Sequence, residues 1–492
     1  MGTGGTRALV IDETGCLVAS ALSEHAAFRS PQVGWAEQDP EDWWRATQET
    51  IRRLLSSGVD ATQIACIGIT GQMHGAVLLN ARNEVLRPAP IWCDQRTQAE
   101  CDGITAKVRP QRLIELTCNP ALTNFTLTKL LWVRKHEPTF WREFRRFLLP
   151  KDFVRLNLTG EAVTDVADAS GTLLLDVANR KWSSQMCEAM ELEVSSLPRI
   201  CESIDISAEI SATAAKLTGL KAGTPVVGGA GDQAAGAVGL GITRPGSVSA
   251  TIGTSGVVFA ATNRPALDPQ GRIHTFCHAI PGRWHVMGVT QAAGLSLRWF
   301  RDQFAAVGTT GDAAYRELCE EAAKAPPGAD GVLWAPYLMG ERTPHLDSNA
   351  RAALIGLTAN HQRKHIVRAI LEGVAFSLRD SLTIFSHIGV PVNRIRLGGG
   401  GARNSLWRQI QAEVYGMDVE TVVAEEGAAF GAAILAAVGS GAWPSVDQAC
   451  ESIVKTAARI QPDPANIRRM NEAYTRYRRL YPALHSIFLA NR

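Results

Sequence analysis

The pattern of apolar and polar positions in the first half of the chain predicts strands that alternate with helices. Residues 7–12 and 16–24 have the pattern of two strands joined by a hairpin turn at Thr14-Gly15. A helix is expected over 39–58, which opens with Asp-Pro-Glu and closes with Gly. The same pattern then predicts a buried strand over 64–70, a helix over 126–138, and a strand, glycine-rich turn and helix over 224–241.

The second half repeats this plan in the same order. Residues 246–262 have the pattern of a strand, a Gly/Thr turn and a second strand, and 284–294 that of a strand and turn. Residues 395–414 predict a strand, a glycine-rich turn and a helix, and 361–385 a long helix with one apolar stripe. Matching order indicates a duplicated α/β domain. The expected units are an N-terminal domain over 1–243, a C-terminal domain over 244–440 and a helical extension over 441–492.

The two halves differ at their Gly/Thr turns. In the second half the turn at 252–256 follows the strand expected over 246–251. The matching turn of the first half begins at Gly2, with only Met1 before it. We therefore expect the first-half sheet to lack the strand that would precede this turn. Neighbouring strands would then have unpaired backbone groups and uncovered apolar side chains.

Composition and charge narrow the class of protein. The chain has 492 residues, 46% of them hydrophobic, and a formal net charge of +2. This size favours two or three domains, and the near-neutral charge argues against nucleic acid or an anionic membrane as partner. Ten cysteines without a C-x-x-C pair are typical of reduced thiols. No signal peptide or membrane-spanning run is recognisable. We expect a soluble, cytoplasmic α/β enzyme.

Glycine-rich turns are candidate phosphate sites. Backbone N–H groups and Thr hydroxyls in the two Gly/Thr turns can bind phosphate oxygens, although a plain tight hairpin is the alternative for each turn alone. The glycine run within 397–407 can admit an adenine, with Asn404 bonding the nucleoside. It lacks the following acid of a dinucleotide-binding fingerprint, and such a run is more often a simple turn.

Four side chains are candidates for the chemistry itself. Asp232 ends a buried strand in "GGAGDQ" and can orient or deprotonate a hydroxyl, unless it only caps the helix that follows. Met73 and His74 lie on the turn "GQMHG", where a structural histidine is an equal alternative. Asp94 can bind a hydroxyl or pair with Arg96. The spacing in "HTFCH" gives zinc little support, because no second cluster completes four ligands.

Taken together, these stretches resemble the FGGY family of carbohydrate kinases. "AALIGLTANHQRKHIVRAILE" and "TLTKLLWV" resemble the two family signatures, with Asn124 a departure in the second. "GQMHGAVLL", "LLPKDF", "HTFCHAIPGRWHVMG", "PYLMGERTPH" and "LGGGGARNSLWRQ" look like stretches of the bacterial-type xylulokinases within that family. The resemblance covers nearly the whole chain.

The resemblance implies two duplicated actin-like ATPase (ribonuclease-H-like) domains with a cleft between them. It implies D-xylulose and ATP as substrates, Mg²⁺ as cofactor, and leaves a homodimer open. Asp232 would be the general base and would also reach the metal. The sugar pocket would be lined by Met73, His74, Asp232, Gln233 and Asp94. The nucleotide would be bound by Thr3, Gly253, Thr254, Ser255, Gly400, Gly401 and Asn404.

Two departures keep alternatives open. Gln233 stands where xylulokinases usually have Asn and glycerol kinases have Gln. The carboxylate that the family places at the end of its first strand, before the Gly/Thr turn, is not in this sequence. The alternatives are another FGGY kinase acting on ribulose, fuculose or glycerol, a chaperone-type ATPase that works through partner proteins, and an inactive or weakly active homologue.

Overall fold

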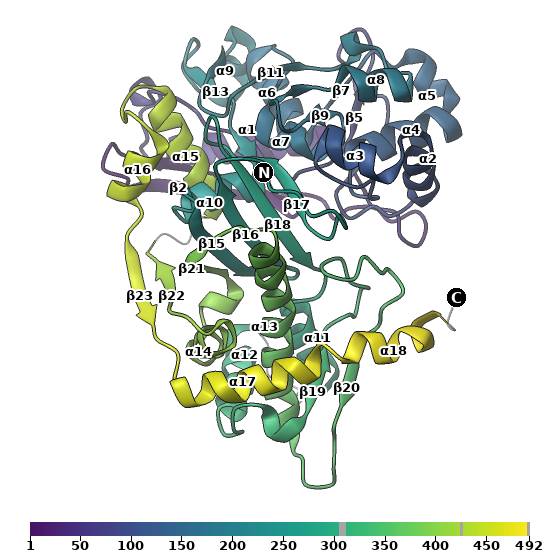
Figure 1. The fold of residues 1–492 in the computed structure, drawn as a ribbon. Helices are drawn as coiled ribbons and strands as arrows, with labels where there is room; N and C mark the ends of the chain where they lie inside the picture. The colour runs from purple at the N-terminus through teal and green to yellow at the C-terminus, as the bar shows by residue number, and fades with distance from the viewer. Residues whose placement is uncertain (305–310, 424–426, 490–492) are drawn as a thin grey trace.

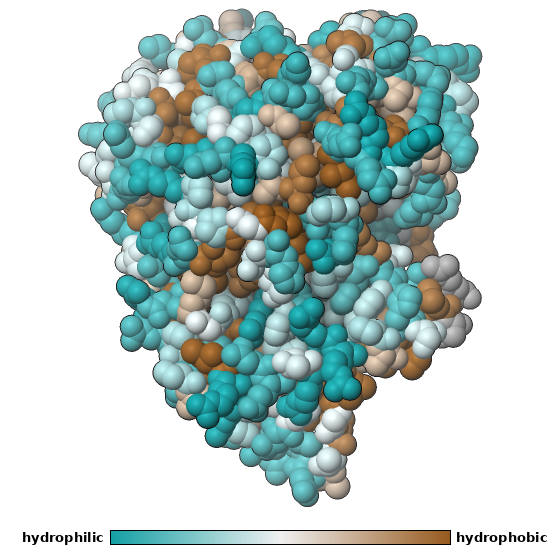
Figure 2. Space-filling view, in the orientation of Figure 1, coloured by the Kyte–Doolittle hydropathy of each residue, from teal (hydrophilic) through white to brown (hydrophobic). Residues whose placement is uncertain are grey.

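The chain forms two lobes. The computed structural model describes residues 1–304, 311–423 and 427–489. The first half of the chain makes one lobe, and most of the second half makes the other (Figure 1). Figure 2 shows apolar side chains gathered where the lobes meet, on a face that is otherwise mainly hydrophilic. Within the described ranges, no helix combines the length and the apolar character needed to cross a membrane.

A seven-stranded sheet forms the centre of the second half. Its strand order is β17-β18-β16-β15-β21-β22-β23. β15 is parallel to β21, and β21 to β22, whereas the other neighbours are antiparallel. The predicted strand–turn–strand is confirmed as β15 and β16. The bounds are β15 Gly246–Ile252, β16 Gly256–Thr262, β17 His274–Cys277, β18 Trp284–Thr290, β21 Val392–Gly399, β22 Val419–Val422 and β23 Thr456–Ile460.

The long helix α13 (Arg363–His387) confirms the prediction over 361–385 and forms the core of this lobe. Ile370, Val374 and Leu378 of the predicted apolar stripe are buried, but so is every other residue from 367 to 378. This stretch of the helix is therefore enclosed on all sides, and the expectation of packing through a single apolar face is wrong there. It contacts β18 and β16 of the sheet. Four more helices pack around it: α11 (Gly294–Phe304), α12 (Gly311–Ala322), α14 (Ser405–Tyr415) and α17 (Pro464–Tyr477).

The first half begins with the predicted hairpin. β1 (Gly5–Ile11) and β2 (Leu17–Glu24) pair antiparallel across a turn that contains Gly15. The predicted helix is α1 (Pro40–Ser56), and its N-cap Asp39 accepts a hydrogen bond from the N–H of Glu41. This cap satisfies one of the free N–H groups of the first turn. The predicted helix over 126–138 is α4 (Thr126–His136).

The rest of the first-half sheet is divided into short pairs. β4 (Thr70–Gly71) runs parallel to β14 (Ala230–Gly231), and β12 (Ile206–Glu209) runs antiparallel to β13 (Pro225–Val227). The strand predicted over 64–70 is therefore regular only at its end. Before β4, this segment makes only an isolated parallel bridge, between Ile67 and Val226. The difference arises because regular strand geometry needs pairing partners that a local pattern does not reveal.

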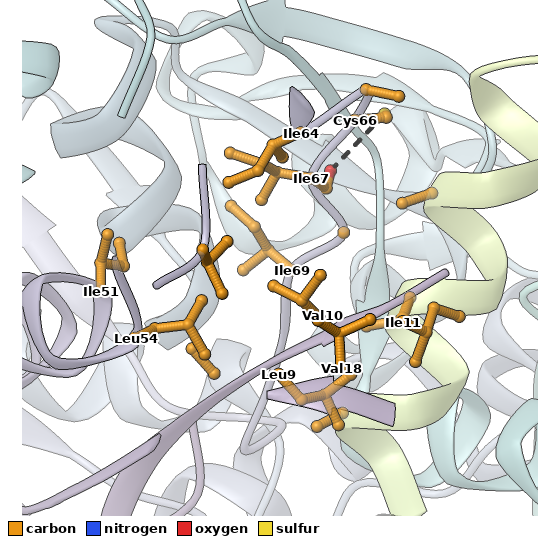
Figure 3. Close-up of a pocket in the computed structure, with 18 of the residues that line it drawn as sticks. Leu9, Val10, Ile11, Val18, Ile51, Leu54, Ile64, Cys66, Ile67 and Ile69 are labelled. Atoms are coloured by element: carbon orange, nitrogen blue, oxygen red, sulfur yellow. Dashed lines mark hydrogen bonds between the residues drawn. The ribbon is translucent and has the colours of Figure 1, made fainter. Parts of the chain in front are cut away.

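A cavity of about 610 Å³ separates β1 from residues 64–70. Apolar side chains from both segments and from α1 point toward it (Figure 3). β1 pairs with β2 alone, and the 64–70 segment is paired on its other side, with β13 and β14. In the second half, β15 lies in the corresponding place, between β16 and β21. The labelled lining residues are Leu9, Val10, Ile11, Val18, Ile51, Leu54, Ile64, Cys66, Ile67 and Ile69.

The C-terminal part joins both lobes. α15 (Gly427–Gly439) and α16 (Val446–Ile453) pack with α10 (Asp232–Gly239) of the first half. The segment expected as a helical extension, 441–492, also supplies β23, the edge strand of the large sheet. The sequence pattern missed β23 because it is short and sits at an edge. α17 buries Met470, Tyr474 and Tyr477, which recur at helical spacing on one face.

Candidate active site

Two parallel strand ends bring the predicted sugar-site residues together. Thr70 pairs with Ala230 and Gly71 with Gly231, so β4 and β14 end at the same edge. Gln72-Met73-His74 follow β4, and Asp232 follows β14 directly. A Cβ atom on Gly231 would lie 2.7 Å from Cγ of Met73. Only glycine allows this approach, so the Asp232 turn and the Met73 turn are in direct contact.

Asp232 is the first residue of α10 and does not cap it. The N-cap is Gly231, and no side-chain cap bond forms there, so the capping alternative does not describe this residue. Its Oδ1 accepts a long hydrogen bond of 3.4 Å from Nε2 of Gln233. Burial raises the pKa of Asp232 to about 6. The carboxylate is thus a base near neutral pH that accepts one weak side-chain hydrogen bond and interacts with the charge of the Met1 ammonium.

His74 is held in one orientation by two hydrogen bonds. Its Nδ1 lies 2.8 Å from the carbonyl oxygen of Gly171, and its Nε2 lies 3.2 Å from Nδ2 of Asn124. Burial lowers the pKa of His74 to about 3. The ring is therefore neutral, with Nδ1–H donating and Nε2 accepting. This is the structural histidine with satisfied hydrogen bonds that the sequence left as an alternative. His74 has a φ of 69° and lies on the turn at residues 72–74, which we call the sugar turn.

Asn124 was missed as a site residue by the sequence reasoning. It is buried and donates to His74, from 50 residues further along the chain. It also lies at the start of the segment that forms α4, and its carbonyl oxygen accepts from Lys129 Nζ. The only signal in the sequence was its departure from the family signature. A contact over this separation has no local pattern.

The Asp94 carboxylate accepts hydrogen bonds from nearby protein groups. Its Oδ2 lies 2.7 Å from Arg96 Nη2 and 2.7 Å from the N–H of Ala36. Arg96 also stacks over Trp35, 3.7 Å from the ring centroid. The structure thus forms the Asp94–Arg96 pair that the sequence left open as the alternative to sugar binding.

The first-half Gly/Thr turn lies against the sugar turn. Thr3 Oγ1 donates to Gln72 Oε1 at 3.1 Å and accepts from Trp92 Nε1 at 2.9 Å. The Met1 carbonyl oxygen accepts from the N–H of Gln72 at 2.9 Å. Thr3 is therefore next to the residue that precedes Met73, at the same sheet edge as Asp232.

The two predicted nucleotide loops lie side by side in the second half. The parallel pairing of β15 with β21 sets Thr251 opposite Gly398 and Ile252 opposite Gly399. Gly399 has φ of +70°, and a Cβ there would lie 2.5 Å from the Ile252 carbonyl oxygen. The Gly253–Ser255 turn and the Gly400–Gly401 loop thus leave adjacent strand ends. Gly253 and Thr254 are exposed, as a phosphate-binding turn requires.

Further contacts fix these loops. The N–H groups of Gly294 and Leu295, at the start of α11, donate to the carbonyl oxygens of Gly253 and Thr254 at 2.9 and 3.1 Å. Asn404 is the N-cap of α14, and its Oδ1 accepts from the N–H of Trp407 at 3.2 Å. One part of the Asn404 amide is therefore structural, and the amide NH₂ is the part that can face a nucleoside.

A buried charge cluster lies beneath the sugar turn. Lys151 Nζ is 2.5 Å from Asp152, 2.6 Å from Asp165 and 3.4 Å from Asp168. A Cβ on Gly231 would lie 3.1 Å from Asp168 Oδ1, so the cluster contacts the turn that carries Asp232. Lys151 and Asp152 belong to the "LLPKDF" stretch that the sequence flagged only by resemblance. The pairing with Asp165 and Asp168 has no local signal.

The described residues contain no group of three or more His, Cys, Asp or Glu side chains suited to hold a metal ion. Mg²⁺ commonly binds through one or two carboxylates, waters and substrate phosphates. Asp232, whose carboxylate has only one weak side-chain hydrogen bond, therefore fits a Mg²⁺ that arrives with a nucleotide.

Comparison with known proteins shows the family of the chain. The models of the FGGY family of carbohydrate kinases match the chain with their N-terminal domain over residues 1–239 and their C-terminal domain over 248–440. The chain belongs to the FGGY family of carbohydrate kinases and has its duplicated, actin-like α/β fold.

Among the relatives that the chain resembles are several xylulose kinases. A xylulose kinase of Bacillus subtilis is 38% identical over 482 residues, which are 98% of this chain and 95% of the relative. A xylulose kinase of Escherichia coli is 38% identical over 98% of both chains. The crystal structure of xylulose kinase from Rhodospirillum rubrum superposes with a TM-score of 0.91 at 32% identity, and covers 99% of this chain and 98% of the other.

Proposed function

We propose that this carbohydrate kinase transfers the γ-phosphoryl group of ATP to D-xylulose, to give D-xylulose 5-phosphate and ADP. The observation that carries the proposal is the meeting of the β4 and β14 ends, which sets the Asp232 carboxylate beside Met73 and His74. The 38% identity to xylulose kinases over nearly the full length supports D-xylulose as the sugar.

Asp232 is the general base in this proposal. A sugar hydroxyl oxygen attacks the γ-phosphorus, its proton passes to an oxygen of Asp232, and the bond to the ADP oxygen breaks in line. A pKa of about 6 suits this role, because the carboxylate is ionised at neutral pH yet basic enough to take a proton. Met73, His74 and Gln233 line the sugar pocket. Asp94 is also assigned to the sugar site, where its pairing with Arg96 would orient it.

The nucleotide is bound at the other strand ends. We assign Gly253, Thr254 and Ser255, together with Thr3 of the first half, to the phosphates, and Gly400, Gly401 and Asn404 to the adenosine. Asp232 is the carboxylate assigned to Mg²⁺, directly or through water. When bound, Mg²⁺ neutralises charge on the phosphate oxygens.

A coupled ADP-release assay tests the proposal. We expect turnover to be faster with D-xylulose than with D-ribulose, glycerol or no sugar. Glycerol turned over as well as D-xylulose would contradict the assigned sugar, and it is the sharpest comparison because Gln233 resembles glycerol kinases at this position. Turnover that is independent of any sugar would instead favour an ATPase that works through partner proteins.

A further inference from the structure

Arg342 is fixed by the backbone of the second half, and its charge acts on His74 of the sugar turn. The N–H of Thr343 donates to the Val289 carbonyl oxygen at 2.9 Å, and the N–H of Val289 donates to Thr343 Oγ1 at 3.0 Å. Val289, near the end of β18, belongs to the same apolar cluster as Met73. These two bonds therefore anchor the residue after Arg342 to a strand that packs against the candidate sugar site.

A row of rings continues from Arg342 to His74. Arg342 Nη1 lies 3.5 Å from His274 Nε2. The ring centroid of His274 is 5.6 Å from that of Phe125, which is 5.4 Å from that of His74. Phe276 stacks on His274 at 5.2 Å and lies 6.1 Å from His74. The guanidinium of the second half is thus two ring contacts away from the sugar turn of the first.

Among the described residues no carboxylate forms an ion pair with the Arg342 guanidinium, although the charge of the neighbouring Glu341 favours its protonated form. Glu341 accepts instead from the N–H groups of Gln291 and Arg342 at 3.0 and 2.8 Å, and from the Thr290 hydroxyl. Burial lowers the pKa of Arg342 to about 10, so the group stays protonated at neutral pH. A half-buried, unpaired cation is costly unless a ligand or solvent completes it.

The two histidines in this row of rings have no free N–H group to donate to a ligand. His74 Nδ1 is bonded to Gly171, and His274 Nδ1 lies 3.2 Å from Asn119 Oδ1. Arg342 has five N–H groups in a planar fork, and only one of them has a partner here, at long distance. Arg342 is therefore the strongest free hydrogen-bond donor of the ring row.

A ketose presents groups that match this donor. Its carbonyl oxygen only accepts hydrogen bonds, and the adjacent hydroxyl oxygen can accept a second one, which suits a planar fork. The hydroxyl that reacts must face Asp232, so the carbonyl end of an extended five-carbon sugar lies away from it.

We infer that Arg342 is a substrate-binding and specificity-determining residue that donates hydrogen bonds to the carbonyl end of the ketose. This inference rests on the proposed function, since it assumes that a ketose is the acceptor. It makes the second half of the chain contribute to sugar recognition as well as to nucleotide binding.

The test compares Arg342→Gln with Arg342→Lys in the full chain. The KM for D-xylulose is measured together with the inhibition constant of D-arabitol, the corresponding polyol without a carbonyl. A charged hydrogen bond lost to a bound ligand corresponds to a change of about 10- to 100-fold. We expect Arg342→Gln to raise the KM for D-xylulose by this factor. The KM for ATP and the D-arabitol constant should change several-fold less, and Arg342→Lys should recover part of the loss.

Arg351→Gln is the matched control. Arg351 lies nine residues along the same segment, is exposed, and donates to the Ser348 and Ala350 carbonyl oxygens; its loss should leave both constants unchanged. A KM for D-xylulose within twofold of the unaltered protein in Arg342→Gln, with an unchanged melting temperature, overturns the inference. Equal increases for D-xylulose and D-arabitol overturn the carbonyl assignment. If the unaltered protein does not phosphorylate D-xylulose, the proposed function fails first.

Discussion

The two halves carry the same Gly/Thr turn on sheets of different completeness. In the second half, β15 lies between β16 and β21, and the sheet runs through seven strands. In the first half, β1 pairs with β2 alone, and a cavity of about 610 Å³ lies between β1 and residues 64–70. The turn motif is followed by a strand in both halves, but only in the second half does a paired strand also precede it, so the motif alone does not fix the sheet around it.

This difference in sheet completeness separates the residues for chemistry from the residues that contribute most to stability. The nucleotide loops leave a continuous sheet whose residues Val258 and Ala250 are fully buried. The sugar turn and Asp232 leave the short pair of β4 and β14, supported from below by the Lys151 cluster rather than by a wide sheet. We expect chemistry to depend most on the first half, and stability on the second.

The largest expected effect is on chemistry in the first half. Asp232→Asn keeps the size of the side chain but removes the base, so turnover should fall by about 10²–10⁴-fold. Coupled ADP release measures turnover, and equilibrium binding of D-xylulose should change little. The melting temperature serves as the control. Turnover within a factor of a few of the unaltered protein would show that another group takes the proton.

The pH dependence should report the same carboxylate. Asp232 must be ionised to accept the proton, and burial raises its pKa to about 6. kcat/KM should therefore fall about tenfold per pH unit below 6 and level off above it. A plateau that continues down to pH 4.5 in the unaltered protein would separate Asp232 from the rate.

Next in size is a matched pair of core truncations. Val258 in β16 is fully buried within the seven-stranded sheet, whereas Val10 in β1 is half-buried and lines the cavity. Val258→Ala should lower the free energy of unfolding by about 1.5–3 kcal/mol, and Val10→Ala by less than about 1 kcal/mol. Denaturant titration measures both. Equal losses would mean that the first-half hairpin is as tightly packed as the large sheet.

The local sequence pattern predicted most elements and few of the contacts. The β1–β2 hairpin, the Asp39 cap and the stripe of α13 follow from turn chemistry, capping and helical period. β23 and the loss of regular strand over 64–69 did not follow, because strand pairing is decided by distant partners.

The same limit applies to the candidate site. Met73, Asp232 and the glycine loops carried local signals, since each follows a predicted strand. Asn124 and Arg342 did not, because their contacts join His74 to a residue 50 positions away and Arg342 to one 68 positions away. The assigned roles of all these residues remain predictions for the experiments above.

The smallest expected effect is a gain in stability at the cavity beside β1, and the same kind of change in the large sheet should have the opposite sign. Ala433 in α15 lines the cavity and is half-buried, so Ala433→Leu can extend apolar atoms into free space. It should raise the free energy of unfolding by about 0.5–1 kcal/mol. The same change at Ala250, fully buried in β15, should lower it by about 1–3 kcal/mol through overpacking. Ala433→Gln is the control, because glutamine adds length without apolar character. It should not raise the free energy of unfolding. A loss at both alanines would show that the first-half cavity has no room for added side-chain atoms, and the contrast between the two sheets would then be one of pairing alone.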